Sequence, residues 1–196
     1  MSGTVPQLDA NGRLRHLITL DGLDAALVGQ LLDRAQAAIG RAGELPPRGA
    51  GPAGWTVANL FAEPSTRTRA SFELAAVRLG ADPINLDVML SSRVKGESII
   101  DTIYTLQEMQ VDVFVIRDAE PGIHDYVARH VGPHVSVISG GEAHISHPTQ
   151  GLLDALTIRQ CKGGFAGLAV TIVGDIRHSR VARSPPRPLA PLAPPG

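Results

Sequence analysis

The sequence has one cysteine, few aromatic residues and almost no net charge. Among its 196 residues, 4% are aromatic, and 18 Lys and Arg residues oppose 19 Asp and Glu residues. A single cysteine excludes a disulfide framework and a cysteine-rich zinc or iron–sulfur site. A net charge of −1 argues against a nucleic-acid binder, which would hold phosphates on a basic face.

Long apolar runs are also missing. No stretch of about 18 apolar residues occurs, so no segment is predicted to span a membrane. Residues 1–11 are polar and lack the apolar centre of a signal peptide, so we expect a cytoplasmic protein. A hydrophobic content of 43% is enough to build a core.

Helical and strand-like segments alternate along most of the chain. Apolar periodicity, short apolar runs and Gly or Pro breaks predict helices over 21–40, 65–79, 98–110, 123–130 and 147–160, and strands over 55–61, 84–88, 111–116 and 135–138. This alternation predicts an α/β fold with a doubly wound parallel sheet. Ligands of such sheets bind at the carboxyl ends of the strands, so the loops after the strands are the places to look for a site.

The chain is predicted to divide near residue 146. Residues 1–146 form the first domain, and residues 147–184 add a linking helix and a strand over 168–173 that begins a second α/β domain. Six prolines fall within residues 185–196. Because proline removes a backbone donor, we expect this last stretch to be an unstructured tail.

The loop after the first predicted strand is rich in hydrogen-bond donors. Ser65, Thr66, Arg67 and Thr68 open a helix, where backbone N–H groups and the helix dipole favour an anion. Hydroxyls and a guanidinium add donors of their own. One or two such residues would be read as a helix cap with a solvated arginine, but four in a row favour an anion site.

Two later loops carry cationic residues. Ser91 and Lys95 lie in a polar loop that suits either phosphate binding or simple solvation. Arg117 ends an otherwise apolar strand, so its side chain points either to solvent or to a ligand. Residues 175–184 hold three arginines at every third position, which form either an exposed basic face or a clamp for a carboxylate.

A further polar group opens the helix predicted over 147–160. His147 has the chemistry to donate to a carbonyl oxygen, and Gln150 to bind an amide. His144 and His147 have no evident third ligand, so we expect no metal site. Residues 163–167 are glycine-rich but precede a strand, so they are no dinucleotide fingerprint, and no cofactor is expected.

These motifs follow one another in an order that resembles a known family. The run from Ser65 to Arg69, the loop from Ser91 to Glu97, Arg117, the motif from His147 to Gln150, and residues 174–184 are similar to the catalytic chains of the aspartate carbamoyltransferase family. The resemblance covers residues 13–184. Lys95-Gly96-Glu97 and Thr149 favour the aspartate enzymes over their ornithine-using relatives.

The resemblance implies a reaction and a set of roles. The family transfers a carbamoyl group from carbamoyl phosphate to L-aspartate, giving N-carbamoyl-L-aspartate and phosphate, early in pyrimidine (UMP) synthesis. By analogy, Ser65, Thr66, Arg67 and Thr68 hold the phosphate, and Arg67 also helps it to leave. The remaining implied roles are carbonyl donors for Thr68, Arg117 and His147, a carbamoyl amide contact for Gln150, and an aspartate carboxylate contact for Arg180.

The resemblance also implies an assembly. The family forms homotrimers in which the loop with Ser91 and Lys95 reaches into the neighbouring subunit's site, and regulatory chains are possible partners. Neither nucleic acid nor a membrane is expected as a partner.

Two features depart from the family pattern. Asp118 follows Arg117 where a histidine is expected, which places an acid near the edge of the site. After about residue 184 the family pattern gives way to the proline-rich stretch, as in a truncated or frame-shifted chain. We therefore expect weak phosphate binding with little or no transferase activity, and keep an ornithine-type enzyme and a non-catalytic, phosphate-binding or trimer-forming chain as alternatives.

Overall fold

The computed structural model describes residues 7–39, 51, 53–86, 98–176 and 179. Strands and helices alternate as predicted, with ends that differ from the predicted ones by a few residues. The described elements are α1 (Ala25–Ala38), β1 (Thr56–Phe61), α2 (Thr66–Leu79), β2 (Asp82–Leu86), α4 (Ile99–Glu108), β3 (Val113–Asp118), α5 (Ile123–His130), β4 (Ser136–Glu142) and α6 (Pro148–Lys162). None of the helices in the described part is long and apolar enough to cross a membrane.

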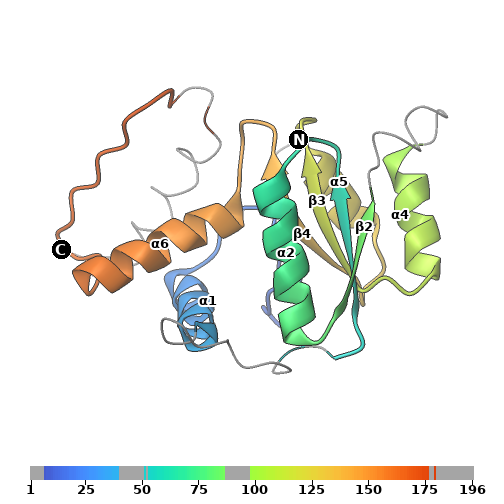
Figure 1. Ribbon diagram of the computed structural model, residues 1–196, viewed down its shortest axis with the longest axis horizontal. Coiled ribbons are helices and arrows are strands. Elements are labelled where there is room, and N and C mark those ends of the chain that lie inside the picture. Colours follow the sequence, from blue (N-terminus) through green and yellow to red (C-terminus); the bar gives the residue numbers. More distant parts are fainter. Residues whose placement is uncertain (1–6, 40–50, 52, 87–97, 177–178, 180–196) are drawn as a thin grey trace.

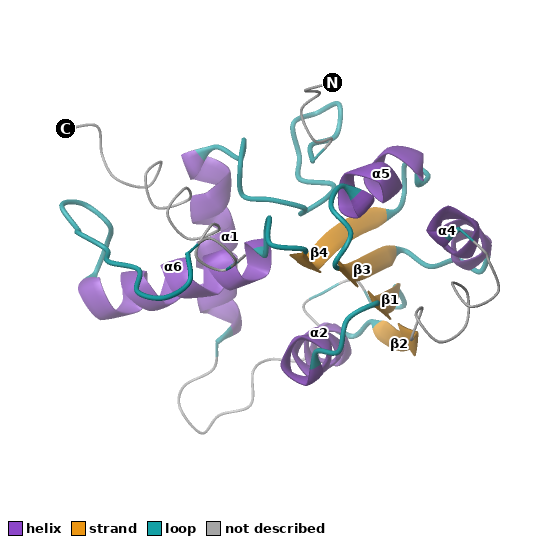
Figure 2. Ribbon diagram, turned by 90° about the horizontal axis from the view of Figure 1, so that it is seen from above, coloured by secondary structure: helices purple, strands orange, loops and turns teal. Residues whose placement is uncertain are grey.

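The four strands form one parallel sheet in the order β2-β1-β3-β4. The central strands β1 and β3 are buried almost throughout, as expected for strands covered on both faces. Helix α2 covers one face of the sheet, and α4 and α5 cover the other (Figure 2). The predicted doubly wound parallel sheet is therefore confirmed.

The alternation of side chains along β1 and β3 builds two core layers. Successive residues of a strand point to opposite faces, so each strand contributes to both layers. The layer beneath α4 and α5 contains Ala58, Leu60, Phe114, Ile116, Ile103 and Val127. The layer beneath α2 contains Val57, Phe61, Val113, Val115, Phe72 and Ala76.

Helices α1 and α6 lie beyond the β4 edge of the sheet and share a third apolar cluster (Figure 1). The segment before α1 pairs with β4 through Leu17, whose N–H donates to the Val137 carbonyl at 2.9 Å. Next to it, the buried His16 accepts the Val137 N–H on its Nδ1 at 3.0 Å. The outer edge of β4 is therefore covered by the chain's own N-terminal segment.

The prediction of a strand over residues 168–173 is wrong. These residues are described, but they form no strand, and Val170 and Val173 are 50% and 92% exposed. An extended segment becomes a strand only when a neighbour satisfies its backbone groups, and no described strand lies beside this one. Residues 185–196 lie outside the described part, and the division of the chain near residue 146 stays a prediction.

Candidate active site

A cavity of about 590 Å³ opens where β3 ends and where α2 and α6 begin. In Figure 1, the first turn of α2 lies on the side of the sheet to which β1 and β3 point, and the start of α6 comes up beside it. This is the carboxyl edge of a parallel sheet, where ligands of such folds bind. The cavity is lined by Ser65, Arg67, Thr68, Ser71, Phe72, Ala75, Arg117, His147, Thr149, Gln150 and Leu153.

The first turn of α2 supplies one wall of the cavity. Ser65 precedes the helix, but its side chain makes no capping hydrogen bond, and the first turn holds no acidic residue. The helix start therefore keeps its positive end toward the cavity without a carboxylate of its own. Ser65, Arg67 and Thr68 line the cavity as predicted, whereas Thr66 is exposed and is not among the lining residues.

Arg117 lies in the cavity wall and not in open solvent. Its side chain is 13% exposed, and Nη1 donates to the Gly140 carbonyl at 3.0 Å. Nη2 lies 3.3 Å from a carboxylate oxygen of Glu63, a residue of the loop between β1 and α2. The guanidinium therefore does not extend into open solvent, and its contact with a ligand stays a prediction.

The first turn of α6 supplies the opposite wall. His147 precedes Pro148, is 8% exposed, and makes no side-chain capping bond. Its Nδ1 lies 3.3 Å from the hydroxyl of Thr149, and the amide of Gln150 donates to Asp154 at 2.9 Å. Both predicted residues, His147 and Gln150, therefore face the same cavity as the first turn of α2, together with Thr149.

Asp118 does not enter the cavity. It is 1% exposed, and its carboxylate accepts the N–H of Glu120 at 2.9 Å, while its carbonyl accepts the N–H of Ala143 at 2.8 Å. The carboxylate therefore stabilises the turn after β3 by a hydrogen bond. The acid that we expected near the edge of the site is the last residue of β3 and is not among the residues that line the cavity.

Four further residues line the cavity that the sequence motifs do not include. Ser71, Phe72 and Ala75 lie one and two turns beyond Thr68, and Leu153 lies one turn beyond Gln150. Helical neighbours three, four and seven residues on share a face, so this spacing was the available signal.

Several predicted residues lie outside the described part of the chain. These are Ser91, Lys95 and Arg180, and also Arg177 and Arg183. Among the residues that the structure describes, no group of three or more His, Cys, Asp or Glu side chains is placed to hold a metal ion.

Comparison with known proteins identifies a matching family. The family model for the carbamoyl-phosphate-binding domain of aspartate/ornithine carbamoyltransferases matches residues 15–160. That range contains all the residues that line the cavity.

Solved structures give the same result. The chain is similar to the catalytic subunit of aspartate transcarbamoylase from M. jannaschii, with 33% identity and a TM-score of 0.82 over 92% of this chain and 58% of that one. It is also similar to aspartate transcarbamoylase from Trypanosoma cruzi in complex with carbamoyl phosphate, with 31% identity and a TM-score of 0.80 over 90% of this chain and 54% of that one. The chain thus spans a little over half the length of these relatives.

Proposed function

The chain belongs to the aspartate/ornithine carbamoyltransferase family, and on this premise we propose that it binds carbamoyl phosphate and serves its transfer to L-aspartate. The observation that carries the proposal is the cavity itself. Two helix starts, two guanidinium groups, an imidazole and several hydroxyls meet there, and none of the described lining residues is acidic. Such a set of donors suits an anion whose charge shifts during a reaction.

The phosphate end of the ligand fits the first turn of α2. Ser65, Thr68 and the backbone N–H groups there offer short donors, and Arg67 offers a planar bidentate one. Thr66 would act from its exposed position through its backbone. Arg67 is also the residue that we propose to neutralise the phosphate as it leaves.

The carbamoyl end then lies toward Arg117 and the start of α6. Thr68, Arg117 and His147 would donate to the carbonyl oxygen, and Gln150 would hold the carbamoyl amide. In the reaction the amine of aspartate attacks the carbonyl carbon, and the carbonyl oxygen becomes an oxyanion. When the carbonyl re-forms, the C–O bond to phosphate breaks, and the proton of the amine passes to the departing phosphate. The step needs orientation and charge stabilisation, which this set of side chains can provide.

The finer assignments form the rest of the proposal. We infer that Arg180 binds the aspartate carboxylate, that residues 147–184 start the aspartate-binding domain, and that homotrimers share sites through Ser91 and Lys95. From membership of the same family we also infer a cytoplasmic location and a role early in pyrimidine synthesis. Regulatory chains are proposed as further partners on the same ground. An aspartate transcarbamoylase from Trypanosoma cruzi solved in complex with carbamoyl phosphate and aspartate, 32% identical to this chain, supports aspartate as the acceptor.

The test is transfer of label from [¹⁴C]carbamoyl phosphate to each candidate amine. We expect a low rate of transfer to L-aspartate, none to L-ornithine, and a loss of about 100-fold in Arg67→Ala. Arg78→Ala, at the exposed end of α2, is the matched control and should keep the wild-type rate. Product with ornithine alone would contradict the aspartate assignment. Binding without any product would favour a non-catalytic chain.

A further inference from the structure

We propose that the buried pair of His124 and Glu142 is a positioning device that aims Arg117 and His147 into the cavity. Neither His124 nor Glu142 lines the cavity. The inference rests on the proposed function, because it concerns two donors of that same site. His124 and Glu142 would then orient the residues that bind the ligand, in addition to filling the core.

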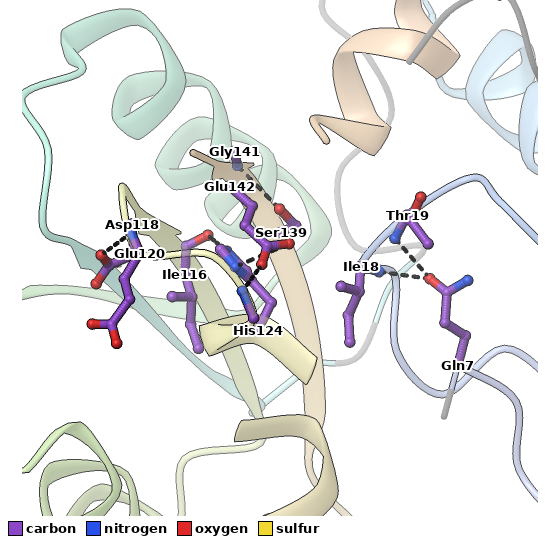
Figure 3. A network of polar contacts seen from close by, with 11 residues as sticks. Gln7, Ile18, Thr19, Ile116, Asp118, Glu120, His124, Ser139, Gly141 and Glu142 are labelled. Carbon is purple, nitrogen blue, oxygen red and sulfur yellow. Dashed lines mark hydrogen bonds and ion pairs between the residues drawn. The ribbon is translucent and has the colours of Figure 1, made fainter. Parts of the chain in front are cut away.

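His124 holds the strand end that carries Arg117. It lies in the first turn of α5 with no exposed surface, and its Nε2 lies 2.8 Å from the carbonyl oxygen of Ile116 (Figure 3). A carbonyl oxygen only accepts, so this nitrogen donates. Ile116 is the residue immediately before Arg117, so the imidazole fixes the peptide from which the Arg117 side chain departs.

The strand is irregular at this point, which makes such a clamp necessary. The pairing between β3 and β4 shifts register between Ile116 and Asp118, so Arg117 falls within the irregularity. A bulge redirects a side chain and leaves local backbone groups outside the regular ladder. The hydrogen bond to Ile116 then helps to hold the guanidinium in place, together with its own contacts to Gly140 and Glu63.

Glu142 joins this clamp to the end of β4. Its carboxylate is buried, accepts the N–H of Gly122 at the start of α5, and lies 3.6 Å from Nδ1 of His124. Burial alone raises the pKa of this carboxyl, but the neighbouring imidazole of His124, together with the Gly122 N–H, brings the pKa below its ordinary value. Glu142 is therefore an anion at neutral pH, held between two elements.

The backbone of Glu142 holds the segment that carries His147. The Glu142 N–H donates to the Ser146 carbonyl at 2.9 Å, and the Ser146 N–H donates to the Glu142 carbonyl at 3.4 Å. Ser146 immediately precedes His147, as Ile116 immediately precedes Arg117. One buried pair is thus anchored one residue away from each of two donors that line the same cavity.

A purely structural role makes a different prediction. A buried polar pair gains little stability over an apolar pair of the same size, because both groups lose their hydration. If the pair only filled space, replacing it would change the unfolding free energy and leave the Arg117 side chain where it is. If the pair positions Arg117, the side chain must become more mobile in protein that is still folded.

The experiment compares Glu142→Gln and His124→Gln with Arg129→Gln in the 196-residue chain. Arg129 forms an exposed pair with Asp125 on the same helix α5, so its replacement is a matched control. The first readout is the NMR signal of the Arg117 Nε–H group, assigned with Arg117→Lys, at a temperature at which circular dichroism shows each variant folded. We expect the signal to move and broaden in both test variants, as for a side chain in free rotation, and to stay in place in the control.

The second readout is the Kd for carbamoyl phosphate, which should rise about tenfold in both test variants. If the wild-type chain binds no carbamoyl phosphate, the proposed function fails, and the Arg117 signal alone decides the positioning role. An Arg117 signal that is unchanged in both test variants would overturn the inference, whatever their stability. If one variant does not fold, the other gives the same decision.

Discussion

The side chain of Arg117 divides its hydrogen bonds between the protein's own groups before any ligand arrives. One nitrogen donates to Gly140, and another lies 3.3 Å from the carboxylate of Glu63. The carbonyl oxygen of carbamoyl phosphate, which we assign to Arg117, would compete with this carboxylate for the same guanidinium. We therefore expect Glu63 to weaken ligand binding by about the strength of a partly solvated ion pair.

Replacing Glu63 by Gln should tighten the binding of carbamoyl phosphate. The amide keeps the size of the side chain but removes the competing charge, so we expect the Kd for carbamoyl phosphate to fall about two- to fivefold in calorimetric titration. Glu108→Gln, at the exposed end of α4, is the control and should leave the Kd unchanged. Weaker binding by Glu63→Gln would contradict the competition and would mean that Glu63 orients Arg117.

His16 makes the stability of the chain depend on pH. Burial, and then the charge of Arg15, lower the pKa of His16 to about 4 from 6.5. The unfolded chain therefore binds a proton at a higher pH than the folded chain does. The stability that comes from the neutral imidazole is complete above pH 6.5 and is lost as the pH falls from 6.5 to about 4.

The unfolding free energy should therefore drop by up to about 3 kcal/mol across this window, as measured by urea denaturation at several pH values. His16→Gln keeps an acceptor for the Val137 N–H but does not titrate, so its curve should be flatter by that amount. An equally steep curve for the variant would show that other groups cause the loss.

At the scale of elements, the sequence was informative where local pattern and tertiary packing agree. Helix α5 has the predicted ends, and Gly80 takes the left-handed conformation that closes α2. Helix α1 begins four residues later than the 21–40 pattern suggests, because Asp24 accepts the N–H of Leu27 and so caps the helix there. The sequence pattern alone could not fix the first residue of α1, since other residues before Asp24 also suit a helix start.

The failure over 168–173 has a different physical cause. The apolar residues there have strand-like composition, but a strand is stabilised by neighbours, and none of the described strands lies beside them. Composition alone cannot supply that information. Parallel pairing, by contrast, brings distant strand ends to one edge, so Arg117 meets the lining residues of segments 65–68 and 147–150 in one cavity, while their roles stay predictions.

A pair of identical substitutions tests this account of residues 168–173. Val173→Ser should change the unfolding free energy by less than about 0.5 kcal/mol, because Val173 is 92% exposed. Val115→Ser, in the sheet core with 1% exposure, should cost more than about 2 kcal/mol. Urea denaturation measures both. A comparable loss in the two variants would mean that Val173 is packed in solution.

At the scale of the whole molecule, the cavity depends on two packing units. The first turn of α2 is set by its contact with the sheet, through residues such as Phe72 and Ala76. The first turn of α6 is set by β4 and by the cluster that α6 shares with α1 and the N-terminal segment, through residues such as Leu17 and Leu156. Motif order in the sequence identified both walls, but only the packing shows that they face each other.

The most direct test of the account is a calorimetric titration of the chain with carbamoyl phosphate, repeated with Arg67→Ala and Arg78→Ala. Both arginines belong to α2, but only Arg67 lines the cavity. We predict saturable binding by the wild-type chain and by Arg78→Ala, and a Kd at least tenfold higher for Arg67→Ala. Equal binding by all three proteins, or no binding by the wild-type chain, would contradict the assignment of this cavity to carbamoyl phosphate.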